Sequence, residues 1–442
     1  WGGILNVTNG NSQNYSIRGQ INYDGVIDEI HQITALAGME IRETRDWANG
    51  ARYYGYNEKT LIAGSQLPNP YINIWGYNSY LTDASPETDY QRRYLSYYGN
   101  LSYTLMNKYV LSGSVRYDDY NNFGVDRKYR ATPMWSTGFS WHIGREDFIM
   151  DNVRWLNQLT FRTTYGYNGN IDPGQYPFTN ISLSTSNDGF TQLPSSSITA
   201  AANPSIRWEK TGVLNFGLDF AVLNHRLSGS IEVYRKYSRD LFAEYTINPI
   251  FGANSTRSYT LTRNAAKVDG KGVDIALNGT IVQKSDFNYR ASLTFSYNTN
   301  EVKSSPYELY SSFASSGGGS GRMIEGYNMN NFWATRWAGL DEEGNALVYN
   351  ADGEIIKSTE NITNDDLVYM GTLTPKYFGG FFNTFTYKGL SLYVGITYKL
   401  GYIFQKPTIS QQPASRYGGA NYEINEDMAK RWREAGDEAK TD

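Results

Sequence analysis

The residue types that most often perform acid–base or metal chemistry are scarce in this sequence of 442 residues. It contains three histidines, His31, His142 and His225, and no cysteine. Metal ligation needs several ligand side chains close together, yet the histidines form no His-x-His or His-Glu-x-x-His pair. The Gly-x-Ser-x-Gly turn of serine hydrolases is also absent. We therefore predict no catalytic residues, no metal site and no cofactor, and we assign the histidines structural or interfacial roles.

Aromatic side chains are better candidates for binding, because the sequence has 38 tyrosines and 10 tryptophans. Their rings can stack on sugars or pack against a partner protein. The alternatives are an aromatic girdle at a membrane boundary, or packing of one loop on another. The predicted ligand or partner contacts are Trp75, Tyr77, Tyr80, Tyr327, Phe332 and Trp333, all in long connections between expected strands.

Strict alternation of apolar and polar residues is the main structural signal. In residues 286–300, Phe287, Leu293 and Phe295 fall on one face, with Thr294 and Ser296 on the other. A period of two predicts a strand with one apolar and one polar face. The same pattern recurs in 95–105, 135–143, 159–167, 213–220, 227–237, 273–281 and 392–400. We expect about a dozen strands, many longer than the usual five or six residues.

The length of these strands favours a membrane barrel. A tilted strand needs about 9–11 residues to cross the hydrocarbon layer, and 90–106, 207–222 and 286–300 are long enough. No apolar stretch approaches the roughly 18 residues of a membrane helix. The near-neutral balance of 40 basic and 44 acidic residues argues against a nucleic-acid partner.

The expected connections alternate between short and long, which is typical of an up-and-down barrel with short periplasmic turns and long extracellular loops. A sandwich with Greek-key connections would not keep this parity. Residues Asp341 to Asn345 predict a tight turn inside one long connection. The short connections fall near 24–29, 107–108, 144–153, 224, 284–285 and 388–389, and the long ones near 44–89, 121–129, 170–206, 244–258 and 301–376.

Several short sequence motifs occur in one consistent order over nearly the whole chain. They are Arg18-Gly19 with Tyr23, His31 to Glu40, Pro133 to Phe148, Leu159 to Asn170, Asn203-Pro204, Trp208 to Thr211, Asn215 to Asp219, Gly270 to Asp274 and Pro375 to Gly380. In their joint order they resemble the SusC/RagA group of TonB-dependent outer-membrane transporters.

The resemblance implies an all-β transmembrane antiparallel barrel of the large plugged class, with about 22 strands. It implies that residues 1–442 form part of this barrel domain, and that the plug, the TonB-contacting segment and the closing strands lie outside the chain. It also implies localisation in the bacterial outer membrane and active import of an oligosaccharide or oligopeptide. The implied partners are outer-membrane lipid, a SusD-like lipoprotein lid and the TonB-ExbB-ExbD complex, with a dimer of transporter–lipoprotein pairs as one assembly.

Three other functions remain open at this point. A passive porin would lack the plug and the TonB segment. An outer-membrane barrel enzyme would need a clustered acid, base and nucleophile at the barrel rim, which the residues above do not supply. A soluble β-rich carbohydrate-binding protein would partition into water without detergent.

Overall fold

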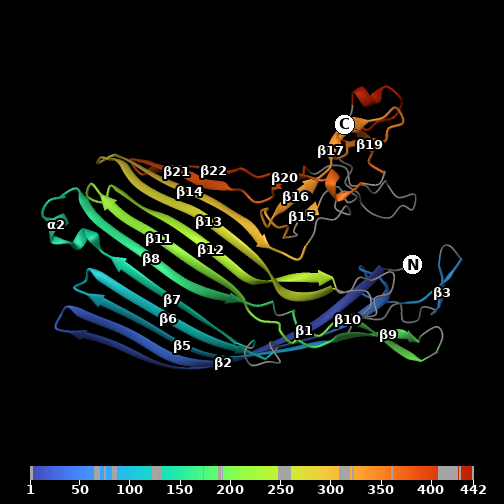
Figure 1. Cartoon of the computed structure of the whole chain (residues 1–442), viewed down its shortest axis with the longest axis horizontal. Coiled ribbons are helices and arrows are strands. Elements are labelled where there is room, and N and C mark those ends of the chain that lie inside the picture. The colour runs from blue at the N-terminus through green and yellow to red at the C-terminus, as the bar shows by residue number, and fades with distance from the viewer. Residues whose placement is uncertain are drawn as a thin grey trace.

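The chain forms one large antiparallel sheet of twelve strands in the computed structural model (Figure 1). The structure describes residues 3–63, 70–73, 76–81, 87–121, 129, 131–172, 174–187, 191, 193–246, 260–307, 319–320, 323–359, 362–406, 427 and 430–440. Each strand pairs with the next long strand of the chain, which confirms the predicted up-and-down order. In sheet order the strands are β1 (Gly3–Ile27), β2 (His31–Tyr56), β5 (Thr88–Leu105), β6 (Tyr109–Tyr120), β7 (Ala131–Trp141), β8 (Leu156–Asn170), β11 (Glu209–Val222), β12 (Leu227–Thr246), β13 (Thr260–Gln283), β14 (Phe287–Ser304), β21 (Tyr377–Tyr387) and β22 (Leu390–Leu400).

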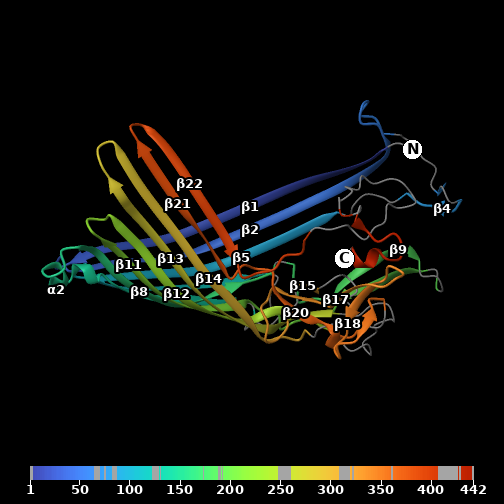
Figure 2. The ribbon, with the colours of Figure 1, turned by 90° about the horizontal axis from the view of Figure 1, so that it is seen from above.

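The sheet is curved, and in the view from above (Figure 2) the strands at its two ends run in different directions. Figure 2 shows β1 and β2 crossing the direction of β14 and β21, which belong to the opposite wall. Strands that tilt in this way are a geometric requirement of a sheet that curls into a barrel.

The two faces of the sheet differ in polarity, as the alternation predicts. On β14, Phe295 and Tyr297 lie on one face and Ser296 on the other. The register carries this division across neighbouring strands, since Phe295 lies opposite Ile275 of β13 and Ser296 lies opposite Asp274. We call these the apolar face and the polar face. The apolar face suits contact with lipid chains, and the polar face suits an aqueous lumen.

The connections keep the predicted parity. One end of the sheet carries only short turns, including the one that holds α2 (Asp147–Met150), and we call it the short-turn end (Figure 1). The other end, the long-loop end, carries the remaining connections. Strands run further into this end than predicted, because β2 continues to Tyr56 and β14 to Ser304. The ladder pairing continues to these strand ends, whereas the alternation of apolar and polar residues is lost before them.

The short turns have backbone conformations that fit tight hairpins. Between β21 and β22 only Lys388 and Gly389 intervene, with φ of 43° and 88°. Two consecutive left-handed residues are characteristic of a type I′ turn, whose twist matches that of the flanking strands. This turn therefore fixes the register of the last hairpin.

Aromatic residues border the apolar band on the apolar face. At its long-loop edge lies an upper aromatic row of Tyr97, Tyr117, Trp135, Tyr165, Tyr167, Tyr237, Tyr297 and Tyr377. At its short-turn edge lies a lower aromatic row of Tyr103, Tyr109, Trp141, Phe161, Tyr289 and Phe385. Neighbouring rings touch in both rows, for example Tyr297 with Tyr377 and Tyr289 with Phe385, at centroid distances of 5.1 and 4.5 Å. Two such rows flank the lipid-facing band of membrane barrels.

Helices contribute little to the fold. Among the described residues they are α2, η1 (Ile143–Arg145), η3 (Asn364–Asp366) and η5 (Asp437–Ala439). None of the helices in the described part of the chain is long and apolar enough to span a membrane.

The turn between β7 and β8 is held by the carboxylate of Glu146. Its Oε1 accepts hydrogen bonds from Tyr109 Oη at 2.6 Å and Trp141 Nε1 at 2.8 Å. Its Oε2 accepts one from Lys108 Nζ at 3.1 Å. These donors, the Tyr109 hydroxyl first, lower the pKa of Glu146 to about 2. One turn residue thus ties two rings of the lower aromatic row to the short-turn end.

Replacing Phe295 with arginine should destabilise the barrel far more than replacing Ser296. Arginine on the lipid-facing side of a barrel costs about 2–4 kcal/mol at the middle of the bilayer and less toward the headgroups. Phe295 lies one step inward from Tyr297 of the upper aromatic row, so part of that cost applies there, whereas arginine at 296 would lie opposite Asp274 on the polar face. In the full-length protein, F295R should lose its heat-modifiable folded form at a lower temperature than S296R on semi-native gels. If F295R and S296R lost the folded form at the same temperature, the assignment of the apolar and polar faces would be wrong.

The Glu146→Gln variant should lose stability at neutral pH, and its difference from wild type should shrink in acid. A carboxyl group whose pKa falls from 4.5 to about 2 on folding stabilises the folded state only while it is ionised. That contribution is complete above about pH 4.5 and disappears as the pH approaches about 2. Thermal midpoints of both full-length proteins across this range provide the measurement.

Asp147→Asn is the matched control for this pH series, since the Asp147 side chain is 86% exposed and an exposed ion pair contributes little. It should differ little from wild type at any pH. A constant difference between Glu146→Gln and wild type across the whole pH range would rule out the ionised carboxylate as the cause.

Candidate functional site

The residues predicted as contacts fall in two connections at the long-loop end. Tyr77 and Tyr80 adjoin the two-residue strands β3 (Tyr71–Ile72) and β4 (Asn78–Ser79), and each is 71% exposed. Trp75, between these strands, lies outside the described residues. Tyr77 and Tyr80 therefore present their rings to solvent, where a ligand or a partner can reach them.

The connection from β14 to β21 holds the other three predicted contacts and folds into two small sheets. One sheet pairs β15 (Gly319–Ser320), β16 (Asn331–Ala334) and β20 (Val368–Thr372), and the other pairs β17 (Arg336–Leu340), β18 (Ala346–Tyr349) and β19 (Ile355–Lys357). Phe332 and Trp333 are consecutive residues of β16, and Tyr327 precedes that strand.

Three rings of this connection form a cluster. Tyr327, Trp333 and Tyr369 pack together, with ring centroids 4.8, 4.9 and 5.6 Å apart. Trp333 is only 8% exposed, and its Nε1 donates to Asn331 Oδ1 at 2.8 Å. Trp333 is thus part of the core of this small sheet, while Tyr327, Tyr369 and Phe332 remain half-buried. Sequence reasoning missed Tyr369, because its partners lie far away along the chain.

The amide of Asn328 anchors this connection to the rim of β14. Its Nδ2 donates to the backbone oxygen of Asn300 at 3.2 Å, and its Oδ1 accepts from Thr372 Oγ1 at 3.1 Å. Beside it, the backbone of Val302 exchanges hydrogen bonds with Gly326 and Tyr327 at 2.9 and 2.8 Å. The connection is therefore fixed to the barrel wall at this point.

The turn between β17 and β18 is the one that the sequence predicted. Asp341 Oδ1 accepts from the backbone N–H of Asn345 at 2.7 Å, and Gly344 has a φ of 79°. The Asn345 side chain, and then the backbone and Lys357, hold the pKa of Asp341 well below its usual range. The carboxylate therefore has a structural role in closing this turn.

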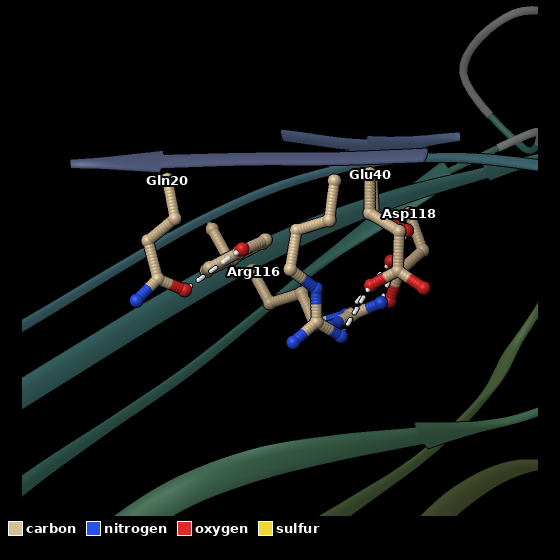
Figure 3. A network of polar contacts seen from close by, with 7 residues as sticks. Gln20, Glu40, Arg116 and Asp118 are labelled. Atoms are coloured by element: carbon tan, nitrogen blue, oxygen red, sulfur yellow. Dashed lines mark hydrogen bonds and ion pairs between the residues drawn. The ribbon is translucent and has the colours of Figure 1, made fainter. Parts of the chain in front are cut away.

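The polar face carries a network of charges on β1, β2, β5 and β6. Arg116 Nε donates to both carboxylate oxygens of Asp118, at 2.8 and 2.9 Å, and its Nη2 donates to Ser96 Oγ at 3.0 Å. Arg18 pairs with Glu40 at 2.9 Å. The arginines each lie 5.8 Å from the ring of Tyr98, whose hydroxyl donates to Gln20. Figure 3 shows Glu40 and Asp118 gathered around Arg116, with Gln20 further along the wall.

A second network lies on the polar face of β8, β11 and β12. Arg162 Nε and Nη2 donate to the two carboxylate oxygens of Asp219, at 2.6 and 2.9 Å. Its Nη2 also donates to Glu232 at 2.9 Å. Neither network was predicted, although the charged residues stand at polar positions of alternating strands. Both give the polar face paired charges instead of a field of one sign.

The histidines lie apart, near three different turns of the short-turn end. His31 Nδ1 lies 2.7 Å from the hydroxyl of Tyr103, and His142 Nδ1 lies 3.2 Å from Thr160 Oγ1. The backbone N–H of His225 donates to Asn157. Within the described residues, no group of three or more histidine, aspartate or glutamate side chains could hold a metal ion. The side chains that the polar face and the long-loop end offer for contact are therefore paired charges and tyrosine rings.

Comparisons with known proteins agree with this geometry. A family described as "TonB dependent receptor-like, beta-barrel" matches residues 2–432. The chain is 28% identical over 411 residues to the TonB-dependent receptor P26 of Formosa agariphila, covering 88% of this chain and 39% of P26. It is 29% identical over 265 residues to the TonB-dependent receptor SusC of Bacteroides thetaiotaomicron, covering 56% of this chain and 26% of SusC.

The solved structure of the RagAB peptide transporter has the same fold. It matches with a TM-score of 0.72 and 26% identity, covering 90% of this chain and 42% of that chain. The chain thus spans about two fifths of the length of P26 and of the matched RagAB chain. The predicted resemblance to the SusC/RagA group is confirmed.

The Trp333→Ala variant should destabilise the small sheet in the connection between β14 and β21 while leaving the barrel folded. Removing a buried tryptophan side chain from a core costs about 3–5 kcal/mol, and Trp333 is the least exposed ring of its cluster. Limited proteolysis of the full-length protein should cleave the variant faster within residues 323–376. Trp337→Ala is the control, because Trp337 is 47% exposed. Equal cleavage of both variants would show that the cluster does not stabilise the connection.

Proposed function

Because the chain belongs to the TonB-dependent receptor-like β-barrel family, we propose that its protein actively imports a large nutrient together with a SusD-like lipoprotein lid. The chain is part of an integral outer-membrane barrel of the SusC/RagA type, and its named relatives are receptors and a transporter, not enzymes. The observation that carries the proposal is the match to the RagAB peptide transporter over 90% of this chain. TonB, with ExbB and ExbD, would supply the energy through another part of the protein.

The proposed cargo is an oligosaccharide or an oligopeptide. A polar face with paired charges, such as Arg162 with Asp219, suits a lumen that passes polar molecules without trapping one charge sign. The exposed rings of Tyr77 and Tyr80 suit stacking on sugars or packing on the lid. Tyr327 and Phe332, half-buried at the rim, are proposed as further contacts, and Trp75 is retained from the sequence prediction.

Residues 1–442 are proposed to be one part of a larger barrel domain. Among the described strands, β1 pairs only with β2, and β22 pairs only with β21. A free strand edge within lipid would leave backbone groups without partners. Further strands of the same barrel, about 22 in total for this class, would provide those partners. The plug and the TonB-contacting segment would lie in the remainder of the protein.

The test is purification of the intact protein from native outer membranes in mild detergent, with mass spectrometry of all retained molecules. A stoichiometric surface lipoprotein and plug peptides in the digest are expected, and retained sugar or peptide would identify the cargo. A lone barrel without lipoprotein and without plug peptides would favour a passive porin instead.

The same purification, repeated with variants, tests which residues contact the lipoprotein lid. The double variant Tyr77→Ala/Tyr80→Ala should reduce lipoprotein retention about tenfold, because exposed aromatic residues contribute strongly to interfaces. The control is Phe148→Ala/Trp155→Ala, which removes two rings, each 58% exposed, from the short-turn end. Equal retention by both double variants would exclude Tyr77 and Tyr80 from the contact and leave import itself untouched.

A further inference from the structure

Two cations face each other on the apolar side of the sheet, next to the upper aromatic row. Arg235 of β12 is the register partner of Lys271 of β13. Both stand at the positions that continue the apolar rows of Val233 and Val273, and both are exposed. Like charges directly opposite each other on one face of a sheet destabilise it, so this pair needs an explanation.

The nearest acidic side chains are already paired with other cations. Asp269 Oδ1 accepts from Arg239 at 2.6 Å, and Glu301 Oε1 accepts from Lys303 at 2.6 Å. Within the described part of the chain, no ion pair joins Arg235 or Lys271 to a carboxylate. Arg235 lies over the ring of Tyr237, with Cζ 5.1 Å from the ring centroid, and a cation–π contact of this kind does not neutralise the guanidinium charge.

Arg235 and Lys271 line a hollow of about 540 Å³. Lys376 and Lys303 bring two further cations to its wall, against the two paired carboxylates of Asp269 and Glu301. Hydrogen-bonding groups are added by Thr299, Asn300 and Tyr327. Hollows of roughly 300–1,000 Å³ accommodate small ligands. The lining therefore combines an excess of positive charge with space for an anionic group that carries a sugar-sized body.

The position of the hollow identifies the source of that anion. Tyr237 and Tyr297, both of the upper aromatic row, flank it on β12 and β14. Such rows lie at the level of lipid headgroups, and the apolar face meets lipid and not the lumen. We propose that Arg235 and Lys271, with Lys376, bind a phosphate group of a glycolipid headgroup in the outer leaflet. This inference rests on the membrane location of the barrel and not on import.

A bound phosphate would place a dianion between Arg235 and Lys271. The carboxylates nearest to these two cations are already paired with other side chains. Arginine binds phosphate through paired N–H donors, and lysine binds it as a point charge. The glycolipid would thereby turn a repulsive register pair into an attractive bridge between β12 and β13. Barrel stability would then depend on the phosphate content of the surrounding leaflet.

The experiment uses the full-length protein in nanodiscs, with diphosphoryl lipid A or dephosphorylated lipid A as the probe. Native mass spectrometry should find diphosphoryl lipid A retained by the wild type. Arg235→Gln and Lys271→Gln should each weaken retention by about tenfold, the usual effect of losing one charge-assisted contact. Lys236→Gln is the matched control, because Lys236 neighbours Arg235 on β12 but lies on the polar face.

Thermal unfolding provides a second readout that a purely structural role would not give. Without phosphorylated lipid, Arg235→Gln/Lys271→Gln should be at least as stable as wild type, because it relieves repulsion. With diphosphoryl lipid A, only proteins that retain both cations should gain stability. Equal retention of dephosphorylated lipid A, or an unchanged gain in the double variant, would overturn the proposal. A gain of the same size from inorganic phosphate alone would overturn the glycolipid and leave a free phosphate site.

Discussion

Each backbone N–H and C=O in the lipid-facing part of the sheet needs a hydrogen-bond partner, because hydrocarbon offers none. The long strands meet this need by pairing with their chain neighbours in an unbroken antiparallel order. Once that ladder is fixed, the register decides which side chains meet. Arg18 lies beside Glu40, and Arg235 beside Lys271, because their Cα atoms are register partners. A shift of one residue would exchange the faces and destroy both contacts.

The sequence predicts those features of the fold that depend on residues close together in the chain. Alternation along β14 identifies the strand and its faces, and the run from Asp341 to Asn345 identifies its turn. It does not predict where β2 ends, because beyond the lipid layer the ladder continues while the alternation is lost. It also cannot pair Tyr327 with Tyr369, since their contact depends on how a long connection folds back onto itself.

The charged networks show a related limit of sequence reasoning. Arg116 and Asp118 stand on one strand, but their partner Ser96 is set by the register of β5 against β6. Polar positions were identifiable from the alternation, whereas the identity of each partner was not. The two faces also treat charge differently. The polar face neutralises arginines such as Arg162 within the protein, and the apolar face leaves the pair of Arg235 and Lys271 to be neutralised from outside.

The anchoring of the connection between β14 and β21 has an evolutionary consequence. Its short strands pair with one another in two small sheets, and it joins the wall at Asn328 and Val302. Substitutions, insertions or recombination inside it should therefore leave the strand register of the barrel unchanged. The sequence of this connection can therefore change faster in evolution than the sequence of the barrel strands. Related proteins should differ in the connection long before they differ in the strands to which it is attached.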